Sequence, residues 1–191
     1  MSASRTKVGI LLSGRGSNMI ALVEASRDPS CPYEVVLVAS DKPEAPGLAW
    51  ATDQGIATWS LSPKGIGKPA YEAALDKALR DAGAETIALA GYMRLISDGF
   101  VGAWRGRMVN IHPSLLPRYK GLDTHTRAIA AGDPVAGCSV HVVTEELDGG
   151  EVLGQAEVPI MAGDTPDTLA ARVLEAEHRL YPEILAEFVT R

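Results

Sequence analysis

The sequence has little of what marks a disulfide-stapled, nucleic-acid-binding or membrane protein. Only two cysteines occur, Cys31 and Cys138, without a CxxC spacing, so neither a disulfide framework nor a cysteine-rich zinc site is expected. The formal net charge of −6 argues against the basic face that nucleic acids require. No apolar run approaches the ~20 residues of a membrane span, and the run at Val8–Leu12 is too short for a signal peptide. These absences predict a cytoplasmic protein.

What is present is an alternation of short apolar, β-rich runs with helix-like segments. This pattern predicts an α/β fold: one domain over residues 1–191, with a mostly parallel, Rossmann-like sheet and helices on both faces. The strands are expected at Lys7–Leu12, Glu34–Ser40, Thr58–Leu61, Thr86–Leu89, Arg107–Ile111, Ser139–Thr144 and Val152–Val158. The helices are expected to begin near Asn18, Gly47, Pro69 and His125, with a last helix over residues 166–189.

Local signals define the last helix and the last pair of strands. Thr165 and Pro166 are typical of an N-cap and a first helical position, while Pro182 is expected to kink or break the helix. The final two strands are expected to form an antiparallel edge hairpin, since Asp148, Gly149 and Gly150 close the polar stretch between them.

A glycine-rich turn, Ser13-Gly14-Arg15-Gly16-Ser17-Asn18, follows the first strand and opens a helix. Backbone N–H groups and the helix dipole converge above such a turn, which predicts an anion site. A tight connection without a ligand would have the same sequence. Met19 replaces the third glycine of GxGxxG and no Gly-Lys-Ser/Thr follows, so a single phosphate fits better than a dinucleotide.

Asn110 and His112 lie near the end of the fifth expected strand. If that strand continues through His112, the period of two places both side chains on one side, at the carboxyl end where open sheets bind ligands. An Asn amide and a protonated His are donors suited to an oxyanion, and Asp148 is the carboxylate that would raise the imidazole pKa. The trio suits direct attack of an amine on a carbonyl.

Other interpretations of these residues were weighed. Ser114 lacks the G-x-S-x-G elbow of a nucleophile, and His112 could simply be a packed histidine beside a proline. Asp123, His125 and Asp148 could ligate a metal, but their spacing is loose, so no metal is predicted. His141 lies on an apolar strand and is expected to be a satisfied interior histidine. His178 is expected to be partly solvated on the last helix.

Longer motifs carry a family resemblance from Val8 to about Pro182. They are the glycine-rich turn, Leu89-Ala90-Gly91-Tyr92-Met93-Arg94, Asn110-Ile111-His112-Pro113-Ser114-Leu115-Leu116-Pro117, Ser139-Val140-His141 and Asp148-Gly149-Gly150. On these motifs the chain resembles the folate formyltransferases, and the turn and short length favour the phosphoribosylglycinamide formyltransferase family of purine synthesis.

The resemblance implies 10-formyltetrahydrofolate as co-substrate and glycinamide ribonucleotide as formyl acceptor. His112 then matches the general acid, Asp148 the residue that raises its pKa, and Asn110 the donor to the formyl oxygen. The implied acceptor site consists of Gly16, Ser17 and Asn18 at the phosphate and Glu177 at the ribose. The implied folate site consists of Lys68, Met93, Arg94, Leu95, Ile96, Asn110, Thr144, Glu145, Glu146, Leu147 and Asp148. Arg15 and Lys68 depart from the common pattern, so their roles are least defined.

Related activities stay open at this stage. A methionyl-tRNA formyltransferase would carry a further basic domain and a folate deformylase an extra N-terminal domain; neither is expected here. An amino-sugar formyltransferase would share the motifs. A non-catalytic folate-binding or nucleotide-binding module would not need Asn110, His112 and Asp148 together. The expected partners are small molecules, and the expected state is a monomer or weak homodimer.

Overall fold

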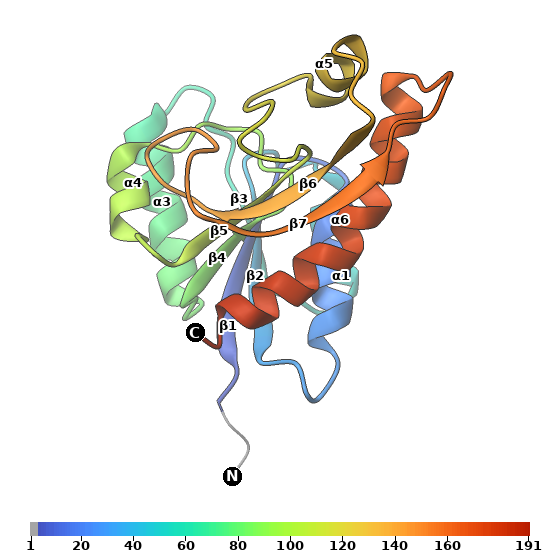
Figure 1. Cartoon of the computed structure of the whole chain (residues 1–191). Helices are drawn as coiled ribbons and strands as arrows, with labels where there is room; N and C mark the ends of the chain where they lie inside the picture. The colour runs from blue at the N-terminus through green and yellow to red at the C-terminus, as the bar shows by residue number, and fades with distance from the viewer. Residues whose placement is uncertain (1–3) are drawn as a thin grey trace.

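The computed structural model describes residues 4–191 and has a seven-stranded sheet at its centre (Figure 1). The strands are β1 Thr6–Leu12, β2 Tyr33–Ser40, β3 Thr58–Ser60, β4 Thr86–Leu89, β5 Met108–His112, β6 Val135–Val142 and β7 Val152–Pro159. The helices are α1 Ser17–Ser26, α2 Pro46–Asp53, α3 Lys68–Asp81, α4 Asp98–Ala103, α5 Thr124–Ala130 and α6 Pro166–Phe188.

The strand order is β3-β2-β1-β4-β5-β6-β7. Strands β1 to β5 pair in parallel, whereas β5 with β6 and β6 with β7 pair antiparallel. The predicted α/β class, the mostly parallel sheet and the antiparallel edge hairpin are therefore confirmed. No helix within residues 4–191 is long and apolar enough to cross a membrane.

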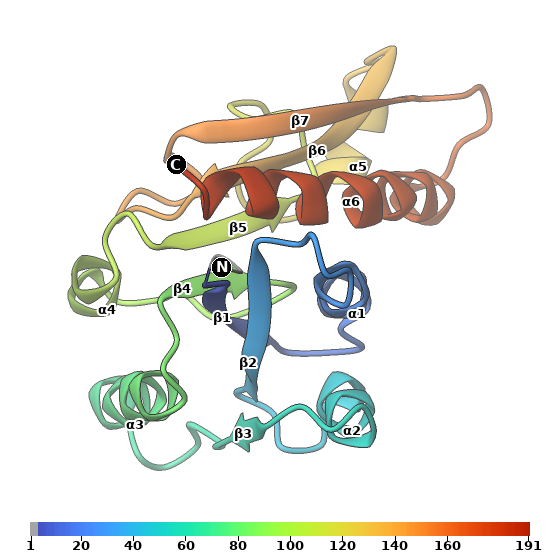
Figure 2. The same ribbon diagram turned by 90° about the horizontal axis from the view of Figure 1, so that it is seen from below.

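Helices cover both faces of the sheet, as Figure 2 shows with α1 and α2 on one side and α3 and α4 on the other. One core layer joins α1, α2, α5 and α6 to the sheet and buries residues such as Met19, Leu48 and Val173. The second layer lies under α3 and α4 and includes Tyr71 and Phe100. Because both faces are covered, buried residues follow one another in central strands such as β1 and β4 and do not alternate with exposed ones, which produces the continuous apolar runs in the sequence.

Three local predictions need correction. The short helix α4 was not predicted, because its Gly-rich segment Asp98–Ala103 has almost no helical periodicity; its Ser97 cap accepts from the N–H of Phe100. Strand β6 begins at Val135, four residues earlier than expected. The predicted break at Pro182 is wrong, since α6 continues to Phe188. A proline inside a helix removes one hydrogen bond, and packing of the helix against α1, β6 and β7 offsets that loss.

The start of α6 was predicted well. The Thr165 side chain accepts a hydrogen bond from the N–H of Thr168, and the Thr168 hydroxyl accepts one from the N–H of Thr165. This reciprocal cap fixes the point at which the last helix starts. The helix then runs along the sheet and brings Glu177 beside the turn that follows β1. A residue late in the sequence thereby joins a site built at its beginning.

Candidate active site

The polar end of β5 forms the centre of the site. Strand β5 includes His112, so the alternation of side chains places Asn110 and His112 on the same side, as the sequence predicted. His112 is buried and Asn110 is half-buried. Both lie at the carboxyl end of a strand that pairs in parallel with β4, where open α/β sheets bind their ligands.

Asp148 reaches this strand end from the loop between β6 and β7. Its Oδ2 accepts a hydrogen bond from the N–H of Gly121 (2.9 Å) and lies 3.5 Å from Nδ1 of His112. The Asp148 side chain is only 8% exposed, so little water screens its charge. Its φ of 50° is left-handed, a conformation that Asp adopts more readily than most residues. The structure thus brings Asp148 against His112.

The other nitrogen of His112 is bound to the main chain. Nε2 lies 2.9 Å from the carbonyl oxygen of Tyr119. Tyr119 has a φ of 54°, an uncommon conformation for a bulky residue, and this turn directs its carbonyl at the ring. Both partners of His112, a carbonyl and a carboxylate, are acceptors. Either can therefore accept a hydrogen bond from a ring N–H of His112.

His141 joins the group from the neighbouring strand. It lies directly opposite Asn110 in the β5–β6 register, with its Nε2 3.2 Å from Nδ2 of Asn110. The same Nε2 lies 3.7 Å from Oδ1 of Asp148. The histidine is buried, as predicted, but it is buried within the candidate site. The register of β6 cannot be derived from the sequence pattern, so the pairing of His141 with Asn110 was not predicted.

The glycine-rich turn has the geometry of an anion site. Gly16 is the N-cap of α1 with a φ of 76°, and a Cβ there would lie 3.2 Å from Cα of Gly47. The sequence needs glycine for both reasons, the left-handed backbone and the close approach of α2. No side chain caps the first turn of α1, so its first N–H groups have no side-chain acceptor and are left for a ligand or water.

A buried polar pair lies behind this turn. Nδ2 of Asn18 donates to Oε2 of Glu177 (2.7 Å), and Oδ1 of Asn18 has no hydrogen-bond partner within residues 4–191. Glu177 is only 6% exposed, and burial raises the pKa of its carboxyl, with the Asn18 hydrogen bond acting in the opposite direction. These two residues, 159 positions apart, are both among the predicted acceptor residues.

Ser13 connects the turn to the loop after β4. Its hydroxyl donates to Oδ1 of the buried Asp41 (2.6 Å) and accepts from the N–H of Met93 (2.9 Å). Its own N–H donates to the carbonyl of Gly91. No role was predicted for Ser13 or Asp41, because a hydroxyl before a glycine turn has no distinctive sequence signal. The glycine-rich turn and the predicted folate segment at Met93 are therefore in direct contact.

The predicted folate segments include both exposed apolar side chains and basic side chains. Met93 and Leu95 are 68% and 71% exposed, and Leu147 is also exposed, which leaves apolar surface uncovered around the site. The Arg94 guanidinium lies 5.4 Å from the ring centre of Tyr71. Tyr71 is one turn along α3 from Lys68. Exposed apolar side chains of this kind suit the flat ring of a folate.

The acidic residues of the Asp148 loop face outward. Glu145 pairs with Arg105, and Glu146 pairs with Nζ of Lys120 at 2.7 Å. The hydroxyl of Thr144, by contrast, lies near the carbonyl of Glu146, so its contact is internal to the loop. Of the predicted residues in this loop, only Asp148 contacts His112.

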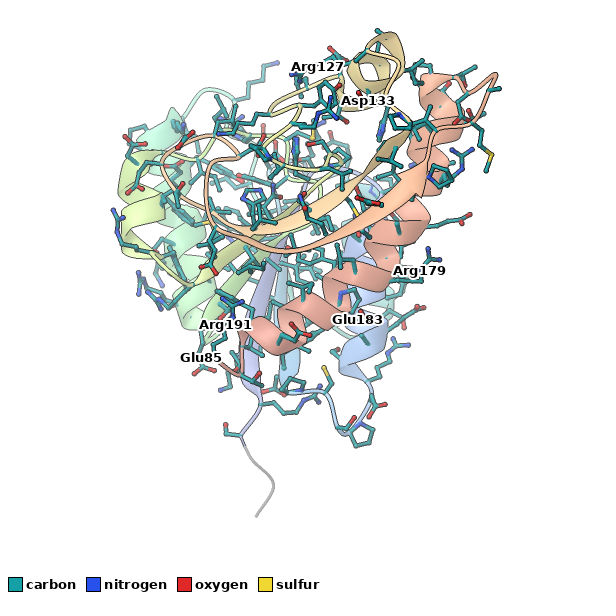
Figure 3. All side chains as sticks on the ribbon, viewed as in Figure 1. Glu85, Arg127, Asp133, Arg179, Glu183 and Arg191 are labelled. Carbon is teal, nitrogen blue, oxygen red and sulfur yellow. The ribbon has the colours of Figure 1, made fainter. Side chains whose placement is uncertain are left out.

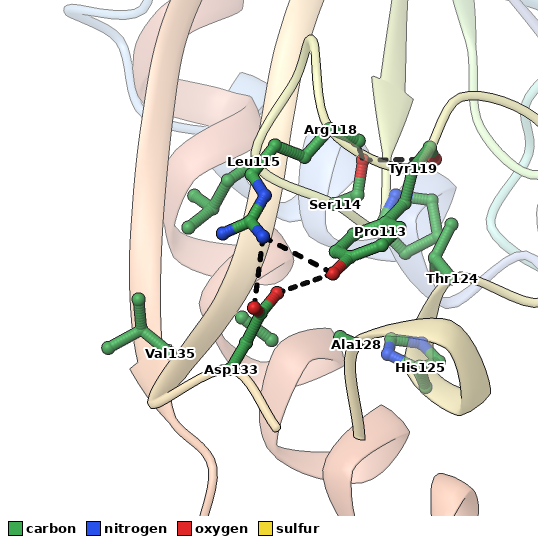
Figure 4. Close-up of a pocket in the computed structure, with 11 residues that line it drawn as sticks. Pro113, Ser114, Leu115, Arg118, Tyr119, Thr124, His125, Ala128, Asp133 and Val135 are labelled. Carbon is green, nitrogen blue, oxygen red and sulfur yellow. Dashed lines mark hydrogen bonds and ion pairs between the residues drawn. The ribbon is translucent and has the colours of Figure 1, made fainter. Parts of the chain in front are cut away.

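A small cavity lies beside the site, behind the loop that follows His112 (Figure 4). Asp133 at its edge accepts hydrogen bonds from Arg118 (2.9 Å) and from the hydroxyl of Tyr119 (2.6 Å). His125 lines the cavity, and burial lowers the pKa of its imidazole. The volume of about 10 Å³ suits a single water molecule at most, so the substrates bind elsewhere.

The metal alternative has no cluster to support it. Within residues 4–191, no three His, Cys, Asp or Glu side chains are arranged to hold a metal ion. Asp123 is exposed at the N-terminus of α5, whereas His125 is directed into the small cavity. A metal-independent reaction stays a prediction.

An open hollow lies outside the turn, between α1 and α6. Ser17 and Glu24 line it from α1, and Arg179 and Glu183 from α6; Figure 3 shows the last two along α6. The two glutamates outnumber the one arginine, so the hollow has no excess of positive charge for a phosphate. An anion is better placed at the turn itself.

Comparisons with known proteins place the chain in a family. The formyl transferase family model matches residues 6–185. Phosphoribosylglycinamide formyltransferase of Escherichia coli is 43% identical, over 94% of this chain and 85% of that protein. The crystal structure of the Brucella melitensis phosphoribosylglycinamide formyltransferase is 52% identical with a TM-score of 0.94, and the match covers 98% of this chain and 97% of that one.

Longer proteins also match. The trifunctional purine biosynthetic protein adenosine-3 of Gallus gallus is 42% identical over 97% of this chain, and the chain spans only 18% of that protein. In the Drosophila melanogaster protein of the same name, the share is 14% at 45% identity. The family model and the relatives of similar length agree with each other: the chain belongs to the formyl transferase family, in the group of the phosphoribosylglycinamide formyltransferases.

Proposed function

We propose that the protein transfers the formyl group of 10-formyltetrahydrofolate to the amine of glycinamide ribonucleotide, with residues 1–191 acting as one formyltransferase domain. The observation that carries the proposal is the convergence of Asn110, His112 and Asp148 at the carboxyl end of β5. The names of the relatives supply the acceptor and suggest the pathway, purine biosynthesis, which we take to be the de novo route. Cytoplasmic location and a monomer or weak homodimer complete the proposal.

In the proposed reaction the acceptor amine attacks the formyl carbon directly. The carbonyl π electrons move to oxygen, and the oxyanion accepts hydrogen bonds from the Asn110 amide and from the Nδ1–H of His112, the ring nitrogen that does not bond to Tyr119. The bond between the formyl carbon and the folate nitrogen then breaks. The folate nitrogen takes a proton from His112, and the proton that the attacking amine loses returns to His112. Asp148 favours the charged imidazolium because its carboxylate lies 3.5 Å from Nδ1.

Each substrate has its own part of the carboxyl edge. We place the acceptor phosphate at Gly16, Ser17 and Asn18 and its ribose at Glu177, where the helix N-terminus and the buried carboxyl lie together. We place the folate along Lys68, Met93 to Ile96 and Thr144 to Asp148, where exposed apolar side chains lie close to Asn110. No metal takes part, since the developing charge is on an oxygen that two protein donors reach.

The direct test supplies 10-formyltetrahydrofolate with glycinamide ribonucleotide and, separately, with amino-sugar nucleotides. Formylated glycinamide ribonucleotide should appear, identified by mass, and a chelator should leave the rate unchanged. Asn110→Leu keeps the side-chain volume but removes the donor, so kcat should fall about 100- to 1000-fold with small changes in either KM. Arg191→Gln, at the far end of the molecule from α5 (Figure 3), is the matched control with unchanged kcat. Formylation of an amino sugar alone would overturn the acceptor assignment.

A further inference from the structure

The polar group at the end of β5 contains one buried side chain that the proposed reaction does not use. His141 is 2% exposed, and its Nε2 lies within 4 Å of both Asn110 and Asp148. Its Nδ1 lies 3.1 Å from the carbonyl oxygen of Val142. Both nitrogens of His141 therefore have polar partners, and one partner is Asn110, the residue proposed to hold the formyl oxygen. His141 is part of the site and not only of the core.

The main chain fixes which nitrogen of His141 carries the proton. A carbonyl oxygen can only accept, so Nδ1 must donate to Val142. In a neutral imidazole the second nitrogen is then an acceptor, and Nε2 accepts from Nδ2 of Asn110. If the ring were charged, Nε2–H would instead point to Asp148, and the Asn110 amide would lose its acceptor.

The surroundings of His141 favour the neutral ring. Burial is the largest influence and lowers the pKa of His141. The hydrogen bond to Val142 and the charge of Asp148 act in the opposite direction, while His112 adds to the lowering. The Asp148 carboxylate is also closer to His112 (3.5 Å) than to His141 (3.7 Å) and takes a hydrogen bond from Gly121. His112 and His141, which both lie beside Asp148, therefore have different roles.

The strand register explains why the side chain at position 141 lies beside Asn110. Asn110 and His141 are paired residues across the antiparallel β5–β6 ladder, so their side chains leave the sheet together on one face. An amide nitrogen has two hydrogens. If one donates to Nε2 of His141, the plane of the amide is set and the other N–H has a fixed direction. No other hydrogen bond of the Asn110 side chain occurs in the described part of the chain.

We propose that His141 is a positioning residue for formyl transfer: as a neutral acceptor it orients the Asn110 amide so that its second N–H faces the formyl oxygen. This inference rests on the proposed function for its kinetic consequence, but the hydrogen bond itself does not. Without His141 the amide is free to rotate or to turn its oxygen toward the substrate, where it would repel the oxyanion. The effect appears in kcat and not in the binding of either substrate, because Asn110 acts mainly on the transition state.

The kinetic test compares two replacements of His141. His141→Leu removes the acceptor and should lower kcat about tenfold, less than the loss of the Asn110 donor itself. His141→Gln places an amide oxygen near the position of Nε2 and should recover most of that loss, to within about threefold of the unmodified protein. In an Asn110→Leu background, His141→Leu should change kcat by less than about twofold, since residues that act as a unit are not additive. Equal, additive losses would overturn the proposal.

A structural control separates positioning from simple destabilisation. Val158 is buried in β7 and pairs with Ala136 at the other end of the same hairpin. Val158→Ala should lower the melting temperature but leave kcat unchanged. If it lowers kcat as much as His141→Leu, the effect belongs to the hairpin as a whole and the proposal is wrong.

A spectroscopic test needs no substrate and therefore reads the inference apart from the proposed function. In ¹⁵N-labelled protein at neutral pH, the side chain of His141 should give the shifts of the neutral, Nδ1-protonated tautomer. Asn110→Leu should shift its Nε2 resonance. An imidazolium or an Nε2-protonated ring would overturn the inference even in an active enzyme. Failure of formyl transfer alongside the expected tautomer would instead place the fault in the proposed function.

Discussion

The glycine-rich turn after β1 and the Asp148 loop after β6 are the two halves of the candidate site, and they are built in opposite ways. Residues 13–18 are contiguous, and the turn, its left-handed Gly16 and the start of α1 all lie within those six positions. Asp148 depends on three segments, since it contacts Gly121, His112 and His141. A local motif fixes its own geometry, whereas an assembled one depends on strand register and on loops that fold back.

This contrast predicts that the largest effect comes from the assembled half. Asp148→Asn keeps the shape and tolerates the left-handed backbone, but it removes the charge beside His112. His112 then becomes a weaker hydrogen-bond donor to the oxyanion and a weaker proton donor to the leaving nitrogen. Steady-state assays should show kcat reduced about 100- to 1000-fold, with the acceptor KM little changed because the turn is untouched.

A second aspartate offers the matched control. Asp123 also has a left-handed backbone, with a φ of 57°, and it is exposed and makes no capping hydrogen bond. Asp123→Asn should therefore leave kcat unchanged. A loss of activity in Asp123→Asn that zinc restores would instead support the metal alternative.

The same contrast explains what the sequence could predict. The parallel strands, the antiparallel edge and the turn follow from apolar runs and from glycine positions, which are local signals. The side on which Asn110 and His112 lie followed from the period of two. The partner of Asn110 did not, because the β5–β6 register that pairs it with His141 is set by the whole sheet. The contacts of Tyr119 and Gly121 with the site use main-chain atoms, and side-chain types carry no signal for those.

The local half is expected to show a smaller and more selective effect. Gly16→Ala forces a Cβ onto a left-handed residue and to within 3.2 Å of Cα of Gly47, so the turn must shift. A strain of about 1–2 kcal/mol corresponds to a rise in the acceptor KM of roughly tenfold. The folate KM should change much less.

Gly55 supplies the matched control for backbone strain. It has the same φ of 76°, but no atom lies within 4 Å of an added Cβ and it is remote from the site. Gly55→Ala should cost stability without changing either KM. An equal rise of both KM values in Gly16→Ala would point to a general folding defect and not to a phosphate site.

The smallest effect separates binding from stability within the acceptor half. Burial raises the pKa of Glu177. The stability that comes from its neutral form is therefore fully present below the pKa that Glu177 has in the unfolded chain, and it is lost as the pH rises through the pKa of the folded protein. Glu177→Gln keeps an acceptor for Asn18 without a buried charge, and should raise the melting temperature at neutral pH by about 2–4 °C, the shift that ~1 kcal/mol gives in a domain of this size. The gain should vanish in acid, while the acceptor KM rises. Glu183→Gln, exposed on the same helix, should change neither quantity. A lower melting temperature for Glu177→Gln at every pH would show that its surroundings stabilise the Glu177 carboxylate, and that burying this group does not reduce the stability of the fold.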